Sequence, residues 1–109
     1  MASKMNVNGK VDLNTFLDQA ASLAKSLDAS TALLYNASNK TVGFYCYNGG
    51  DFVMAVPYSK PTIAHGYSGV IAAGGSVFKV FADNKGDAEF LVKPNAAYVY
   101  KGPGKVEQI

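Results

Sequence analysis

The residue types that enzymes use for covalent or acid–base catalysis are scarce in this chain of 109 residues. His65 is the single histidine and Cys46 the single cysteine, which excludes a histidine-rich zinc site, an all-cysteine metal site and an intrachain disulfide. A Ser-His-Asp arrangement would have to use His65, but the chain has no G-x-S-x-G nucleophile elbow. The eight acidic residues fall mostly in expected turns or on a helix face. The sequence therefore predicts a binding protein, not an enzyme, with no metal and no cofactor.

Tyrosines in two turn-like sequences, PYSKP and HGYSG, are the first candidates for ligand contact. Aromatic rings at loop tips are poorly placed to fill a core, and a tyrosine hydroxyl can reach water or a lipid headgroup. We expect Tyr58 and Tyr67 to enter a membrane interface and Lys60 to contact a phosphate as a point charge. His65 and Ser68 would supply hydrogen bonds.

The remaining tyrosines of interest lie in strand-like sequences. Val42, Phe44 and Cys46 of TVGFYCY alternate with residues that include Tyr45 and Tyr47, so the first set predicts a buried face and the second an outer face. Cys46 is interpreted as a small buried hydrophobe. Later in the chain, the sequence YVY places two more tyrosines on one face. We expect cross-strand packing of Tyr45 and Tyr47 against Tyr98 or Tyr100.

Charge and composition narrow the class of partner. The net charge is only +2, and all ten basic residues are lysine, so the arginine fork that reads phosphate and guanine is missing. We therefore expect no nucleic-acid partner. Residues 1–8 lack the apolar segment of a signal peptide, and no run of about 18 apolar residues marks a membrane span. The chain is expected to be made soluble in the cytoplasm, with release to act outside the cell left open.

One helix is predicted at residues 11–29. An apolar stripe recurs at helical spacing, and Asp12 or Asn14 can cap its start. The stripe consists of Leu13, Phe16, Leu17, Ala20, Leu23, Ala24 and Leu27. We expect this helix to pack on a sheet; lying on a membrane is the alternative.

Short apolar runs separated by turn residues follow the helix and predict a mainly β fold. The expected fold is a single-domain antiparallel β-sandwich over residues 31–101 with the amphipathic helix at its N-terminal side, and with loose tails at 1–10 and 102–109. Strands are predicted at 31–36, 41–47, 51–56, 62–65, 68–73, 76–82, 88–92 and 96–101.

A resemblance to a known family rests on the stretch 36-NASNKTVGFYCYNGGDFVMAVPYSKPTIAHGYSGVIA-72 and on 98-YVYKG-102. The matching pieces are an N-x-S-x-K-T entry into an aromatic strand, an Asp that opens the next strand, an A-H-G turn and G-V-I-A. Together with the preceding helix, these resemble the actinoporins, the pore-forming cytolysins of sea anemones, and actinoporin-like proteins. The chain has no tryptophan, a residue that the family uses in its headgroup site.

The resemblance implies a β-sandwich with a flanking helix, recognition of a phosphocholine headgroup, helix insertion and oligomerisation. The loop positions that carry over are Asn48, Gly49, Tyr67 and Ser68. The expected function is therefore recognition of a membrane surface or lipid headgroup, with a pore-forming cytolysin as its extreme form.

Two alternatives remain open. One is a lectin-like protein that binds a cell-surface glycan, since the fold has lectin relatives. The other is a self-assembling or inhibitory protein whose tyrosines bury in a homo-oligomer or partner interface. The position of the exposed aromatic residues distinguishes them: one loop end indicates lipid or sugar, whereas a strand face indicates protein.

Overall fold

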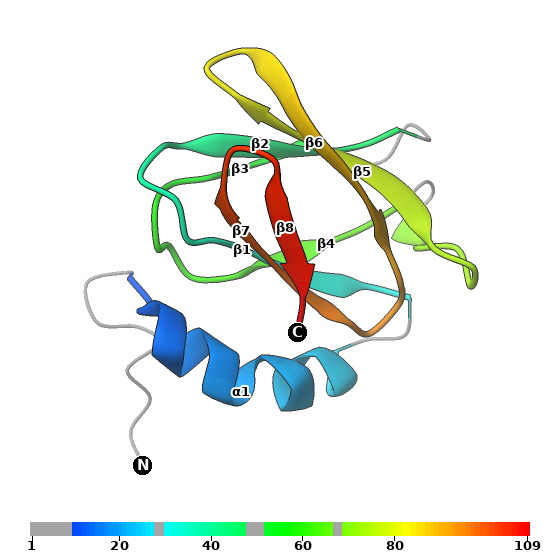
Figure 1. Cartoon of the computed structure of the whole chain (residues 1–109). Helices are drawn as coiled ribbons and strands as arrows, with labels where there is room; N and C mark the ends of the chain where they lie inside the picture. Colours follow the sequence, from blue (N-terminus) through cyan, green and yellow to red (C-terminus); the bar gives the residue numbers. More distant parts are fainter. Residues whose placement is uncertain (1–9, 28–29, 48–51, 67–68) are drawn as a thin grey trace.

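The computed structural model describes residues 10–27, 30–47, 52–66 and 69–109. These residues form two four-stranded sheets packed face to face, with one helix against the outer side of one sheet (Figure 1). The chain is thus mainly β, as predicted. Its elements are α1 (Leu13–Lys25), β1 (Ala32–Asn36), β2 (Val42–Cys46), β3 (Phe52–Ala55), β4 (Thr62–Ala64), β5 (Ser76–Ala82), β6 (Lys85–Val92), β7 (Ala97–Gly102) and β8 (Lys105–Gln108).

The helix begins at the residue that its capping chemistry favours. The side chain of Asp12 accepts hydrogen bonds from the backbone N–H of Thr15 at 3.2 Å and from the Thr15 hydroxyl at 2.8 Å. Asp12, and not Asn14, is therefore the N-cap. The helix ends at Lys25, earlier than the predicted residue 29, and Ser26 satisfies the carbonyl of Leu23 through its hydroxyl at 2.7 Å.

The strand order is β4-β1-β7-β8 in the first sheet and β3-β2-β5-β6 in the second. Neighbouring strands are antiparallel except β1 and β7, which pair in parallel. The sandwich is therefore antiparallel-rich, with one parallel pair that the prediction did not contain. A core of alternating residues from both sheets fills the space between them. Its largest members are Leu34, Val42, Phe44, Ile71, Phe78, Val80, Val92, Tyr98 and Tyr100.

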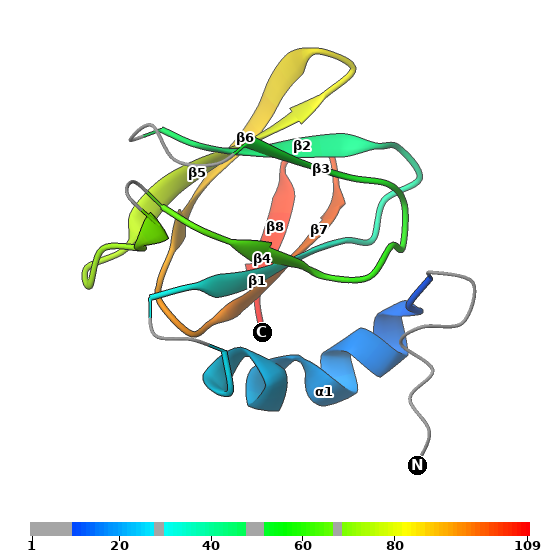
Figure 2. The same ribbon diagram turned by 180° about the vertical axis from the view of Figure 1, so that it is seen from behind.

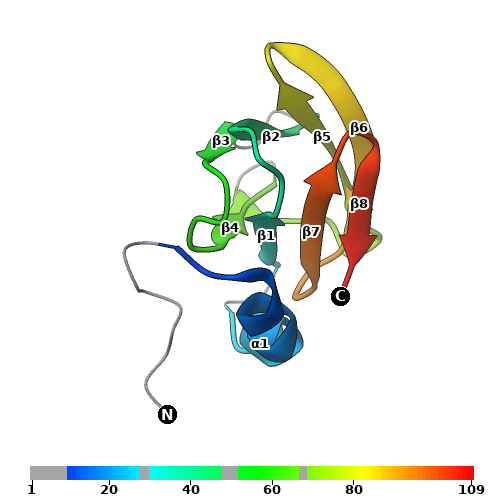
Figure 3. The same ribbon diagram turned by 60° about the vertical axis from the view of Figure 1, so that its left-hand side comes forward.

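A second apolar cluster lies between the helix and the first sheet. Phe16 of α1 stacks on the ring of Tyr35 in β1, with centroids 4.3 Å apart. Leu33 and Tyr35 face the helix while Leu34 faces the other sheet, so β1 is buried on both sides. This double burial explains the continuous apolar run ALLY. Figure 3 shows the resulting layers, with α1 beneath β1 and β7.

Three predicted segments differ from the structure. Residues 102–109 are not a loose end, because β8 pairs with β7 and Val106 packs against the core. Residues 69–73 of the predicted strand 68–73 form no strand; Ile71 alone is buried there, and its N–H bonds to the carbonyl of Ser30. The turn predicted over 83–87 is shorter, since β6 already begins at Lys85.

The expected tail at residues 1–10 lies outside the described residues except for Lys10. Lys10 forms an isolated antiparallel bridge with Ser59, and its ammonium donates to the carbonyl of Pro57 at 2.9 Å. The segment that precedes α1 is thereby held against the connection between β3 and β4.

Candidate functional site

The outer face of the second sheet carries a regular grid of side chains. One cross-strand row runs Phe52, Tyr45, Lys79 and Glu89 from β3 through β2 and β5 to β6. A second row has Met54, Gly43 and Phe81, and a third has Tyr47, Val77 and Leu91. We call this set the aromatic face: Tyr45, Tyr47, Phe52, Met54, Val77, Lys79, Phe81, Glu89 and Leu91.

Ring contacts connect the strands across the aromatic face. Tyr45 lies at the centre, with ring centroids 5.9 Å from Tyr47, 6.0 Å from Phe52 and 6.3 Å from Phe81. Phe52 stacks on Phe81 at 6.2 Å, so the rings of β2, β3 and β5 form one connected group. Such pairs hold the register of neighbouring strands and fix the rings in place.

Much of the aromatic face remains open to solvent. Phe52 is 56% exposed and Met54 is 63% exposed, and Tyr47, Val77 and Leu91 are exposed as well. Single exposed apolar residues are common, but a contiguous patch of them marks a site of interaction. The aromatic face is therefore the first candidate site.

Two glycines let long side chains lie flat on this face. The ring of Phe52 lies over Gly43, where any added Cβ would collide with the ring edge. The Lys79 side chain lies in the same way over Gly86 of β6. Both glycines are thus required for close approach of a side chain to the backbone.

One charged pair lies inside this apolar grid. The Lys79 ammonium is 5.6 Å from the Phe81 ring centroid, 5.8 Å from that of Tyr47, and 3.9 Å from Oε2 of Glu89. The Tyr47 hydroxyl donates to the same carboxylate oxygen at 2.7 Å. The face therefore presents one cation and one anion side by side, each held by aromatic neighbours.

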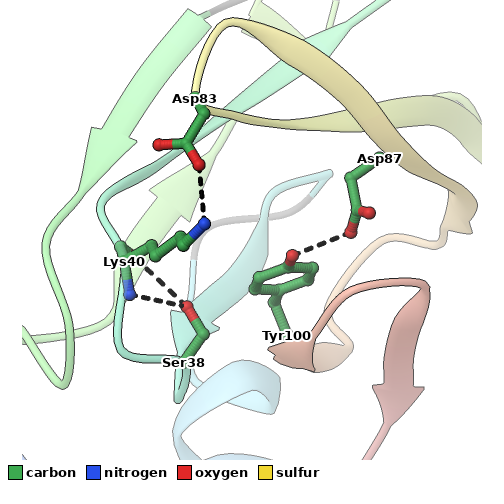
Figure 4. A network of polar contacts seen from close by, with 5 residues as sticks. All are labelled: Ser38, Lys40, Asp83, Asp87 and Tyr100. Carbon is green, nitrogen blue, oxygen red and sulfur yellow. Dashed lines mark hydrogen bonds and ion pairs between the residues drawn. The ribbon is translucent and has the colours of Figure 1, made fainter.

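A second candidate site is a polar cleft of about 310 Å³ at one end of the sandwich. It lies between the β1–β2 loop, the β5–β6 hairpin and the β7–β8 turn (Figure 4). We call it the end cleft; its lining residues are Ser38, Asn39, Lys40, Ala82, Asp83, Lys85, Gly86, Asp87, Tyr100 and Pro103.

Ion pairs and hydrogen bonds order the wall of the end cleft. The Lys40 ammonium lies 2.6 Å from Oδ2 of Asp83. That bond and the Lys40 charge lower the pKa of Asp83, with a smaller contribution from the Lys85 charge. The Tyr100 hydroxyl donates to Oδ2 of Asp87 at 2.7 Å. Burial, followed by the hydrogen bond and the charge of Asp87, raises the pKa of Tyr100 to about 12.

A buried amide supports the loop that forms one side of the cleft. The Asn36 amide nitrogen donates to the carbonyls of Lys40 at 2.7 Å and Ala55 at 2.8 Å. Its oxygen accepts from the backbone N–H of Ser38 at 2.9 Å and from the Ser38 hydroxyl at 2.6 Å. Asn36 is completely buried, so these four bonds hold Ser38 and Lys40 in position.

Of the seven residues predicted from the loops, the structure describes three, Tyr58, Lys60 and His65, and it does not bring Tyr58 and His65 together. Asn48, Gly49, Tyr67 and Ser68 lie outside the described residues. Tyr58 is exposed near the start of α1, where its ring makes an edge contact with Tyr35 at 6.4 Å.

Lys60 and His65 lie farther along the same part of the chain. Lys60 is exposed in the β3–β4 connection, which runs close to the start of α1 in Figure 2. His65 is half-buried beside Ser26 and Leu27, at the other end of the helix from Tyr58. A helix of 13 residues is about 20 Å long, so Tyr58 and His65 cannot contact the same small ligand.

The expected packing of Tyr45 and Tyr47 against Tyr98 or Tyr100 is wrong. The first pair lies on the outer face of the second sheet, whereas the second pair belongs to the first sheet and points into the core. Tyr98 contacts Phe90 at 5.6 Å instead. The expected division of β2 into a buried face with Val42, Phe44 and Cys46 and an outer face is confirmed.

Sequence reasoning missed Phe52, Met54 and Phe81 as members of a site. Each alternates with a buried residue of its own strand, which was a usable signal. The alternation alone did not show that Phe52 and Phe81 meet beside Tyr45, because that depends on the strand order.

Comparison with known proteins assigns this chain to no family. No family model matches the chain, and no curated protein and no solved structure matches it either. The actinoporin resemblance therefore stays a prediction. Within the described ranges there is no cluster of three or more potential metal ligands, and no helix there is long and apolar enough to cross a membrane.

Proposed function

We propose that this chain is a non-enzymatic protein that acts through a protein–protein interface, and that the interface is the aromatic face bound to a second copy of the chain. The observation that carries the proposal is the connected group of rings on β2, β3 and β5, in which Phe52 is exposed and which exposed apolar side chains such as Met54 and Leu91 border. Exposed aromatic residues on a strand face, and not on a loop end, favour a protein partner over a lipid or a sugar.

The asymmetry of the layers supports this assignment. The helix covers the outer face of the first sheet, burying Leu33 and Tyr35. Among the described residues, no helix or strand covers the outer face of the second sheet, although most of the side chains in its rows are apolar. Burial of such an exposed apolar patch drives association, so a partner is expected to cover it.

The charge pattern favours a second copy as the partner. Lys79 and Glu89 are neighbours in one cross-strand row, so the face carries a cation and an anion in equal number. A twofold axis that crosses this row between β2 and β5 would centre the aromatic face on its copy, with Lys79 of one protomer opposite Tyr45 of the other and Glu89 opposite Phe52. Such an isologous contact is self-complementary, whereas a face of one charge sign would repel its own copy.

The size of the face indicates weak association. Four strands spaced about 4.8 Å apart, with rows spanning about six residues of 3.3 Å, give roughly 380 Å² in projection. Stable dimers bury about 800 Å² on each partner. We therefore expect a reversible dimer with a dissociation constant in the upper micromolar range.

Sedimentation equilibrium from about 10 µM to 1 mM tests the proposal over the range of a weak dimer. The molar mass should rise with concentration, and Met54→Lys should raise the dissociation constant at least about tenfold by placing two cations in the interface. Ile63→Lys is the matched control: Ile63 is also exposed in the middle of an edge strand, β4 of the first sheet, and its replacement should leave association unchanged.

Charge reversal makes the test specific for a second copy. Lys79→Glu alone should weaken association, because each face would then carry two negative charges and repel its copy. Lys79→Glu combined with Glu89→Lys should restore it, since each face is then neutral again. A wild-type protein that stays monomeric up to 1 mM would overturn the proposal.

A further inference from the structure

The end cleft shares no residue with the aromatic face, and self-association gives it no role. We propose that the end cleft is a binding site for a neutral, polyhydroxylated ligand, namely one or two units of a saccharide. Its volume of about 310 Å³ lies at the lower end of the range for small-molecule sites, about 300–1,000 Å³.

The balance of charges in the cleft favours a neutral ligand. The lining contains two lysines, Lys40 and Lys85, and two aspartates, Asp83 and Asp87. Lys40 is already paired with Asp83, so a phosphate or carboxylate ligand would have to compete with that ion pair and would meet acidic oxygens in the same cleft. A cation would meet the lysines. Hydroxyl groups can donate to the aspartates and accept from the lysines at once.

One aspartate is positioned to accept such a hydrogen bond. Oδ2 of Asp87 accepts from the Tyr100 hydroxyl at 2.7 Å and from the backbone N–H of Gly104 at 2.9 Å. Within the described part of the chain both bonds use this one oxygen, so Oδ1 retains its lone pairs for a ligand. The carboxylate is thus fixed before a ligand arrives, which lowers the entropic cost of binding.

The opposite wall is preorganised as well. Ser38 lines the cleft, and the buried amide of Asn36 holds its hydroxyl at 2.6 Å. The Ser38 hydroxyl also lies 3.1 Å from the carbonyl oxygen of Lys40. The loop that carries the Lys40 ammonium is therefore held by the interior of the protein and does not depend on the ligand for its shape.

Apolar groups complete the lining. Ala82 and Pro103 line the cleft together with the polar side chains. A pyranose has the same mixed character, with hydroxyls around its edge and C–H groups on its faces. The hydroxyls would bond to Asp87, Ser38 and the lysines, and the C–H groups would pack on the alanine and the proline.

The experiment follows ¹H–¹⁵N NMR shifts of the full chain during titration with glucose, galactose, mannose, N-acetylglucosamine and lactose, each up to about 100 mM to reach weak binding. At least one sugar should shift the amides of residues 38–40, 83–87 and 100–104. Glucose 6-phosphate serves as the anionic probe and should bind more weakly than glucose. Phe52→Lys should leave the shifts unchanged, which separates this test from that of self-association.

Asp87→Asn keeps the size of the side chain and removes its charge, and should weaken binding about tenfold through the loss of a charge-assisted hydrogen bond. Asp18→Asn, an equivalent change on the exposed side of α1, should have no effect. No cleft shift with any of the five sugars, unchanged binding by Asp87→Asn, or stronger binding of glucose 6-phosphate than of glucose would each overturn the proposal.

Discussion

The hydroxyl of Tyr100 in β7 donates to the carboxylate of Asp87 in β6, at 2.7 Å, and so joins the two sheets at the end of the sandwich (Figure 4). Asp87 also accepts from the N–H of Gly104 in the β7–β8 turn. One carboxylate therefore connects the β5–β6 hairpin to β7 and to the turn of the neighbouring hairpin. Because Tyr100 is only 3% exposed, its ring belongs to the core while its hydroxyl belongs to the cleft.

Alkaline pH should destabilise the protein through its buried tyrosines. Burial is the largest cause that raises the pKa of Tyr100 and of Tyr35 to about 12, compared with about 10 in an unfolded chain. The folded state then holds more protons than the unfolded state between these values. Its stability is fully present below pH 10 and is lost as the pH rises through 12.

Urea unfolding followed by circular dichroism at pH 8, 10, 11 and 12 measures this loss. Tyr100→Phe removes one of the two groups, so the free energy of unfolding should fall less steeply with pH in this variant than in the wild type. The slope is the readout, because the lost hydrogen bond lowers stability at every pH. An identical slope in the two proteins would contradict the prediction.

Gly43→Ala should disturb the aromatic face without unfolding the protein. The added methyl group would collide with the ring of Phe52, which must then rotate away from Phe81. We expect the dimer dissociation constant to rise several-fold while the free energy of unfolding changes by less than about 1 kcal/mol, since alanine is the better strand residue. Gly74→Ala is the control, because no atom lies within 4 Å of a Cβ there.

Asn36→Ala should cost about 2–4 kcal/mol of stability. The substitution leaves the carbonyl of Ala55 and the N–H of Ser38 without their amide partner in the interior, at about 1–3 kcal/mol for each group. Chemical denaturation measures the loss. The exposed Asn39→Ala should change stability by less than about 0.5 kcal/mol. Equal effects of the two substitutions would show that the buried amide is not what holds the loop.

Local patterns predicted the parts of the fold that depend on local geometry. The apolar stripe of α1 and the alternation of β2 follow from the helical period of 3.6 residues and the strand period of 2. The alternation of β2 is confirmed, and α1 buries Phe16, Ala20 and Ala24 of the predicted stripe but leaves Leu17 exposed. The strand at the end of the chain was not predicted, because the sequence VEQI is too short to show a period. Residues 105–108 form a strand only because β7 offers its edge for pairing.

The candidate sites could not be predicted from the sequence, because each is formed by residues that are distant along the chain. The loop residues Tyr58 and His65 were grouped because they are close along the chain, and α1 separates them in space. The end cleft joins residues 38–40, 82–87 and 100–103, which no sequence pattern connects. Strand order and the packing of two sheets bring them together.

By itself, the sequence determined most of the element types, the buried side of β2 and the absence of a histidine-rich or cysteine metal site. Each of these follows from residue type and spacing within one segment. Only the tertiary structure decided that Tyr98 and Tyr100 point into the core and do not lie on the outer face beside Tyr45. The face that an alternating strand buries depends on which sheet it joins and on what covers that sheet, and those are non-local contacts.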